Sequence, residues 1–266
     1  IRFIHNGVSR FPETRRQRIP HRRTLPANKL PEIRRTVLPG EFPDEAQSGF
    51  GTFRYFSYLY SMAGLYFHIP FCKRICAYCD FYKSVGLGRM EELAAAMHRE
   101  LEAQREYLGG EAVRTRYFGG GTPSLCPPGT IAGLLDHAGE LFDCSAAEET
   151  TLEANPDDLT PEYLAALRRA GIDRLSIGVQ SFDDACLKLM NRRHDAAQAL
   201  QAVRSAQAEG YGNITVDLIF GMPGFGGDSL RRTLDTVLGL NVQHISAYHL
   251  TIEPVSYTHL RAHETK

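Results

Sequence analysis

The chain has 266 residues, of which 43% are hydrophobic, and its formal net charge at pH 7 is −1. No apolar run approaches the roughly 20 residues needed to cross a bilayer, and the start lacks the apolar centre of a secretory signal. The sequence therefore excludes a membrane-spanning protein and predicts a globular, cytoplasmic one with a substantial core. Three of the six cysteines lie within eight residues, which favours a metal site in a reducing compartment over three disulfides. The other three are scattered and are interpreted as ordinary small residues: Cys126, Cys144 and Cys186.

Charge is distributed unevenly along the chain. Residues 1–61 hold eleven Lys or Arg and five Asp or Glu, whereas the remainder holds 19 and 26. A basic arm can bind nucleic acid or act as a mitochondrial transit peptide. Six prolines, several acids and the lack of helical periodicity argue against both, and the first methionine is Met62. We therefore expect residues 1–61 to be a non-native or disordered upstream segment, and no nucleic-acid partner.

From residue 65 onward, short β-type runs alternate with amphipathic helical stretches. The predicted strands cover residues 65–71, 113–118, 150–154, 174–179, 213–220 and 244–250. Strands that alternate with helices indicate a parallel sheet with right-handed crossovers. Six strands are too few to close an eight-stranded barrel, so the expected fold class is α/β, a partial (βα)6 TIM-like barrel. In such a sheet the functional site lies at the carboxyl ends of the strands.

Two of the intervening helices have clear signals. Apolar residues at multiples of three and four positions predict a helix through Leu93, Met97, Leu101 and Leu108. A later helix is expected to begin with Thr160 as N-cap and Pro161 as its first residue, and to be closed by Gly171.

Cys72, Cys76 and Cys79 follow the first predicted strand in a C-x3-C-x2-C spacing. A [4Fe-4S] cluster has four irons, so three cysteine ligands leave one iron free to bind something else. The alternative is a structural zinc, for which His68 would complete a Cys3His set. Pro70 argues against zinc, because it stiffens the backbone that would have to fold back between His68 and the first cysteine.

This spacing resembles that of the radical SAM enzymes, whose core is a partial barrel of the same kind. The resemblance implies that the free iron is chelated by the amino and carboxylate groups of S-adenosylmethionine (SAM). One electron from the cluster then cleaves the sulfonium to give a 5'-deoxyadenosyl radical. The resemblance also implies that Gly120, Gly121 and Thr122, in the GGGTP turn after the second strand, hold the methionyl end of SAM. A plain tight turn is the alternative for this segment.

Polar residues near the later strand ends suit the other groups of SAM, which are an ammonium, a carboxylate, a sulfonium and a ribose diol. Glu153 suits the ammonium and Arg192 the carboxylate, whereas Gln180 and Asp217 suit the ribose. Singly, such side chains are more often solvated or salt-bridged. Their common placement near successive strand ends favours one shared site.

Seven segments together resemble a narrower family: YFHIPFC, GGGTPS, EANPDD, SIGVQSF, NRRH, DLIFGMPG and SAYHLTIEP. They are similar to the oxygen-independent coproporphyrinogen III oxidase family, and specifically to its radical SAM heme chaperone branch. The resemblance covers the expected core, residues 62–254. It implies that Tyr66 lies beside the cofactor and that Tyr78 lies against its adenine; simple packing in the cysteine loop is the alternative for Tyr78.

Two departures from this family are visible. The oxidases carry a further cysteine two residues after the third, where this chain has Phe81. Residues 255–266 do not resemble the family, whose members normally continue into a C-terminal domain, so that domain is expected to be absent.

The resemblance implies a heme chaperone that binds a [4Fe-4S] cluster, SAM and heme as cargo, and passes the heme to a heme-accepting protein. The alternative is an enzyme, an oxygen-independent coproporphyrinogen III oxidase, which takes a hydrogen from a propionate side chain of a porphyrinogen before carbon dioxide is lost. The expected partners are therefore heme or a porphyrinogen, an electron donor protein and, for the chaperone, the acceptor.

Overall fold

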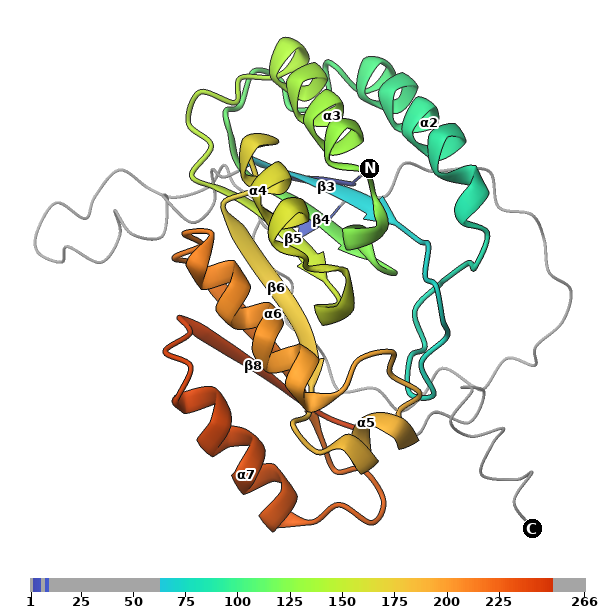
Figure 1. Cartoon of the computed structure of the whole chain (residues 1–266). Helices are drawn as coiled ribbons and strands as arrows, with labels where there is room; N and C mark the ends of the chain where they lie inside the picture. Colours follow the sequence, from blue (N-terminus) through green and yellow to red (C-terminus); the bar gives the residue numbers. More distant parts are fainter. Residues whose placement is uncertain (1, 6–7, 10–62, 251–266) are drawn as a thin grey trace, which may run out of the picture.

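The computed structural model describes residues 2–5, 8–9 and 63–250 of the chain. The strands in these residues form one sheet in the order β2-β1-β3-β4-β5-β6-β7-β8 (Figure 1). The six strands from β3 onward are parallel and follow the chain order, and the sheet is open, as the sequence predicts. They are β3 (Ala63–Ile69), β4 (Val113–Gly120), β5 (Glu149–Ala154), β6 (Arg174–Gln180), β7 (Ile214–Phe220) and β8 (His244–His249).

Helices connect successive strands. The described α-helices are α2 (Met90–Ala103), α3 (Pro128–Leu141), α4 (Pro161–Arg169), α5 (Asp184–Leu189), α6 (Ala196–Ala208) and α7 (Gly227–Leu238). Helices α2 and α3, α3 and α4, and α4 and α6 are neighbours, and Figure 1 shows them lying along one face of the sheet. The other face is therefore left to line the inside of a partial barrel.

Alternation along the strands separates these two faces. In β3, Leu65, Phe67 and Ile69 are fully buried in the core, and the ring of Phe67 stacks on that of Phe118 in β4 at 4.5 Å between centroids. The intervening Tyr66 stacks instead on Tyr117, at 5.8 Å. Every second side chain of a strand therefore faces the inside of the partial barrel.

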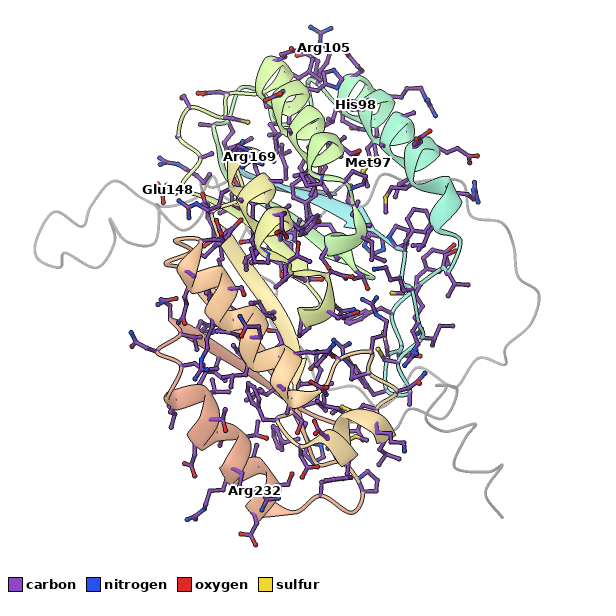
Figure 2. The ribbon with its side chains drawn as sticks, viewed as in Figure 1. Met97, His98, Arg105, Glu148, Arg169 and Arg232 are labelled. Atoms are coloured by element: carbon purple, nitrogen blue, oxygen red, sulfur yellow. The ribbon has the colours of Figure 1, made fainter. Side chains whose placement is uncertain are left out.

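Helix α2 ends earlier than the periodicity suggests. Leu108, expected to belong to this helix, lies beyond its end at Ala103, in turns that run up to two glycines with positive φ, Gly109 and Gly110. Leu108 is nevertheless buried, as Met97 is, because the turns fold it back onto the core, whereas Arg105 in the same turns is exposed (Figure 2). The apolar pattern therefore identified burial correctly and helix length incorrectly.

Helix α4 has the predicted ends. The Thr160 hydroxyl accepts a hydrogen bond from the Tyr163 amide at 3.2 Å, which satisfies one of the free N–H groups of the first turn. Gly171 follows the helix with φ 94°, a left-handed conformation that glycine adopts without steric cost.

Two short strands lie within the first nine residues, β1 (Arg2–His5) and β2 (Val8–Ser9). Strand β1 pairs antiparallel with β3, with Phe3 opposite Leu65. Residues 10–62 and 251–266 lie outside the described residues, so the division at residues 62 and 254 stays a prediction. In the part of the chain that the structure describes, no helix is long and apolar enough to cross a membrane.

Candidate functional site

A cavity of about 560 Å³ opens at the carboxyl ends of the parallel strands. It is lined by the loop after β3 and by the ends of β4 to β8. The predicted site residues among its walls are Cys72, Cys76, Tyr78, Cys79, Gly120, Gly121, Thr122, Glu153, Gln180, Arg192 and Asp217. The remaining one, Tyr66, is not part of the lining; it packs against Tyr117, which is.

The three thiols of the loop after β3 face this cavity together. The Thr122 hydroxyl donates to the Cys72 sulfur at 3.4 Å, and the Arg192 guanidinium donates to the Cys76 sulfur at 3.3 Å. Burial raises the pKa of the Cys72 thiol, and the Thr122 hydrogen bond acts in the opposite direction. Lys83 donates to the carbonyl oxygen of Cys79, a contact that holds the loop backbone at the third cysteine. Two of the three sulfurs, those of Cys72 and Cys76, thus accept a hydrogen bond from another part of the cavity wall.

The three thiols offer the ligand number of a cluster with one open iron. Cys72, Cys76 and Cys79 all line one cavity, as three cysteine ligands of one [4Fe-4S] cluster must. Among the described residues, no group of three or more His, Cys, Asp or Glu side chains is arranged to hold a single metal ion. His68, the fourth ligand of the zinc alternative, does not line the cavity, and its Nδ1 lies 3.2 Å from the Tyr66 hydroxyl.

Arg192 connects the thiol loop to the strand ends. One of its terminal nitrogens donates to the Cys76 sulfur and, at 3.2 Å, to the Tyr78 hydroxyl. The other donates to the Asn155 side-chain oxygen and, at 2.7 Å, to the Gly178 carbonyl. The remaining donor, Nε, is buried without a partner. A buried N–H group without an acceptor costs free energy.

The segment around Arg192 also holds the thiol loop through its backbone. The Ala77 amide donates to the Met190 carbonyl at 3.0 Å, and the Asn191 side chain donates to the Ile75 carbonyl at 2.7 Å. Asn191 is left-handed, with φ 57°, a conformation that Asn tolerates better than most residues. Sequence reasoning did not single out Asn155 or Asn191, although both lie inside segments used for the family resemblance, EANPDD and NRRH.

Two carboxylates stand on the inner wall, one from β5 and one from β7. Glu153 accepts from the Tyr117 hydroxyl at 2.8 Å and from the Gly120 amide at 3.1 Å, and Asp217 accepts from the Ser176 hydroxyl at 2.9 Å. Burial raises the pKa of both groups, and the charge of Asp217 adds to the rise at Glu153. A pair of partly buried, mutually repelling carboxylates favours a bound cation.

The backbone has a positive φ at the ends of two strands, β4 and β6. Gly120 has φ 118°, and a Cβ there would lie 2.7 Å from the His68 ring. In β6 one extra residue between Ile177 and Gln180 shifts the register against β7, and Gln180 is buried with φ 68°. A non-glycine residue in this region costs on the order of 1–3 kcal/mol and is typical of binding sites.

Comparison with known proteins identifies the family. The sequence pattern of the radical SAM superfamily matches residues 66–237, which is more than half of the chain. The chain belongs to the radical SAM superfamily. The open sheet of six parallel strands is the partial barrel of this superfamily. The matched residues include the C-x3-C-x2-C loop and the cavity lining from Cys72 to Ile219, whereas the lining residues from β8 follow them.

Curated relatives of this radical SAM protein include bacterial heme chaperones and mitochondrial radical SAM proteins. It is 39% identical over 194 residues to the heme chaperone HemW of Mycobacterium tuberculosis, covering 71% of this chain and 50% of the relative. It is 40% identical over 193 residues to the mitochondrial radical S-adenosyl methionine domain-containing protein 1 of Bos taurus, covering 72% of this chain and 43% of the relative. The chain thus spans about half the length of the curated relatives it matches.

Solved structures agree on the fold. The coproporphyrinogen III oxidase HemN of Escherichia coli, a radical SAM enzyme, superposes with a TM-score of 0.68 at 29% identity, covering 74% of this chain and 46% of that one. The radical SAM methyltransferase TsrM of Kitasatospora setae superposes with a TM-score of 0.56 at 16% identity, covering 76% of this chain and 37% of that one. The second likeness concerns the fold alone.

Proposed function

We propose that this chain is the radical SAM core of a heme chaperone, which binds a [4Fe-4S] cluster and SAM and delivers heme to an acceptor protein. The observation that carries the choice of chaperone over oxidase is the residue at position 81. Phe81 lines the cavity and is 73% exposed, at the position where the oxidases resembled here have a further cysteine. The likeness to curated heme chaperones at 36–39% identity supports the same choice.

Cys72, Cys76 and Cys79 are the proposed ligands of the cluster. When bound, such a cluster supplies the electron that reduces the sulfonium of SAM. This chain's own contribution is to hold the thiols in place. Thr122 and Arg192 do so by donating to the sulfurs of Cys72 and Cys76. Hydrogen bonds from a charged donor such as Arg192 are about twice as strong as neutral ones.

Glu153 and Asp217 are proposed to bind the ammonium and the ribose of SAM. Glu153 is assigned to the ammonium and Asp217, with Gln180, to the ribose, because all three line the cavity. A positive ligand would favour the charged form of both acids, so its binding should lower both of their pKa values.

The remaining predicted contacts follow from the same cavity. Arg192 is assigned to the SAM carboxylate, because its positively charged guanidinium belongs to a residue that lines the cavity. The backbone of Gly120 and Gly121 with Thr122 is assigned to the methionyl end, and Tyr78 to the adenine. Tyr66 is assigned an indirect role, because it does not line the cavity itself and stacks on Tyr117, which does.

The second candidate function is an oxygen-independent coproporphyrinogen III oxidase. The structural likeness to HemN favours it, since that likeness covers 74% of this chain. Either function requires an electron donor protein, and only the chaperone requires a heme acceptor. The clustered reduced cysteines fit a cytoplasmic location for both.

An extended chain separates the two functions. In this chimera, the second half of the heme chaperone of Mycobacterium tuberculosis follows residue 254. We expect it to bind heme, measured by absorbance titration, and to leave coproporphyrinogen III unconverted in the presence of reductant and SAM. The unextended chain should bind heme weakly or not at all, because the family places part of that site in the second half. Formation of protoporphyrinogen by the extended chain would make the oxidase the better assignment. The matched variant Phe81→Cys tests whether position 81 decides the outcome.

A further inference from the structure

A second set of charged residues lies behind the cavity, around Asp158 at the end of the short 3-10 helix η3 (Pro156–Asp158). The Asp158 side chain is only 3% exposed. One of its oxygens accepts from Lys73 at 2.9 Å. The other accepts from Ser124 at 2.9 Å and from Arg193 at 3.0 Å. A single buried carboxylate therefore joins three loops that are distant in the sequence.

Each of these partners lies one or two residues along the chain from a cysteine of the cavity or from a residue that donates to one. Lys73 follows Cys72, and Arg193 follows Arg192, which donates to Cys76. Ser124 lies two residues after Thr122, which donates to Cys72. The Ser124 hydroxyl also accepts from the backbone N–H of Asn155 at 3.1 Å, and the side-chain oxygen of Asn155 accepts from Arg192. Asp158 therefore binds the sequence neighbours of the residues that contact the Cys72 and Cys76 sulfurs.

The charges around Asp158 are balanced. Arg193 also pairs with Asp157 at 2.9 Å, so two acids face two bases, Lys73 and Arg193. Asp157 touches neither Lys73 nor Ser124 in the contacts that the described residues make. The two neighbouring acids therefore carry the same charge and share one partner, but only Asp158 joins all three loops.

We propose that Asp158 is a positioning residue that sets the geometry of the cavity thiols by holding Lys73, Ser124 and Arg193 together. It acts through those neighbours and does not itself line the cavity. The consequence for a bound cluster rests on the function proposed above, whereas the consequence for the thiols themselves does not.

Asp158→Asn is the direct test, and Asp157→Asn is its matched control. An asparagine has one oxygen where the carboxylate has two, so its N–H group must face either Lys73 or the Ser124 and Arg193 pair. The Asp157 variant removes an equal charge from the same helix and leaves the connection of the three loops intact.

The first measurement uses the cluster-free full chain. Alkylation of each cysteine is followed by peptide mass spectrometry, with Cys186 as a buried reference thiol outside the network. We expect Cys72 to react about tenfold faster in Asp158→Asn than in the wild type, and within about twofold of the wild type in Asp157→Asn. Cys186 should react at the wild-type rate in both. Equal rates at Cys72 in the two variants, or equal acceleration of Cys186 in Asp158→Asn, would overturn the proposal.

The second measurement uses the reconstituted protein. Asp158→Asn is expected to change the electron paramagnetic resonance spectrum of the reduced cluster and to weaken SAM binding about tenfold, whereas Asp157→Asn changes both much less. An unchanged spectrum and affinity in Asp158→Asn would contradict the role toward the cluster. A wild-type chain that takes up no iron would remove the proposed function instead and leave the thiol comparison valid.

Discussion

At the scale of single residues, two partly buried carboxylates line the cavity where we propose that SAM binds. Glu153 and Asp217 both have a raised pKa because burial penalises their charged forms. A carboxyl with a raised folded pKa contributes most to stability below its unfolded pKa, near 4, and loses that contribution as the pH rises through the folded value. Near neutral pH these acids therefore weaken the empty protein, which is a common cost of binding sites.

The first prediction concerns Glu153→Gln. The amide can accept from the Gly120 backbone through its oxygen and donate to the Tyr117 oxygen, so both contacts are kept and only the Tyr117 O–H loses its acceptor. Without the buried charge, the cluster-free protein should melt at a higher temperature at pH 7, by about 2–4 °C for each kcal/mol gained. Its melting temperature should also fall less than that of the wild type between pH 4.5 and 8.

Scanning calorimetry across this pH range measures both effects. Glu148→Gln serves as the control, because Glu148 is exposed and pairs with Arg114 at the surface, where such pairs contribute little. A Glu153→Gln protein that melts lower than the wild type at every pH would contradict the assignment of a destabilising charge.

The second prediction compares Asp217→Ala with Arg192→Ala. Each should weaken SAM binding by about ten- to a hundredfold, since a hydrogen bond to a charged group contributes about 1.5–3 kcal/mol. Asp217→Ala should leave the iron content unchanged, whereas Arg192→Ala should lower it, because Arg192 also donates to the Cys76 sulfur. Titration calorimetry and iron analysis measure the two effects; unchanged SAM affinity in both variants would remove these residues from the site.

At the scale of elements, the site depends on strand ends and on two loops that pack on each other. The thiol loop after β3 has little regular structure, and the segment Met190–Arg192 holds it by two hydrogen bonds to its backbone and one to the Cys76 sulfur. The strand alternation explains why Tyr117, Glu153 and Asp217 share the inner face. The loop conformation follows from neither strand nor helix periodicity.

The third prediction tests which cysteines belong to the site. After anaerobic reconstitution the wild type should hold about four irons per chain. Replacing Cys72, Cys76 or Cys79 by Ala should abolish the cluster, because each thiol lines the cavity. Ala at Cys126, Cys144 or Cys186 should leave the iron content unchanged, since none of these thiols does. Stoichiometric zinc without a brown chromophore, or equal behaviour of all six variants, would be incompatible with the proposed ligand set.

At the scale of the whole molecule, one open sheet carries both the core and the cavity. The antiparallel strand β1 covers the outer edge of β3 over three residue pairs, and the large apolar core lies on the helical face of the parallel strands. Removal of the first segment should therefore expose a strand edge and spare the main core.

The fourth prediction follows from this arrangement. A chain without residues 1–61 should still unfold in one cooperative thermal transition, with a small change in melting temperature, because those residues lack the periodic apolar positions of a core element. Differential scanning calorimetry of the two chains decides the point. Loss of the cooperative transition would show that the segment is part of the folded core.

The sequence by itself determined the six parallel strands and their order, the fold class and eleven of the residues that line the cavity. It could do so because strand alternation, the cap at Thr160 and the C-x3-C-x2-C spacing are local signals that survive without knowledge of the neighbours. The tertiary structure alone decided which groups accept hydrogen bonds from Arg192, and that Tyr66 stacks on Tyr117. It also decided that Leu108 is buried outside a helix and that Asp158 joins three loops. Those contacts join residues whose approach depends on crossovers, register and loop packing, and no local pattern encodes such distances.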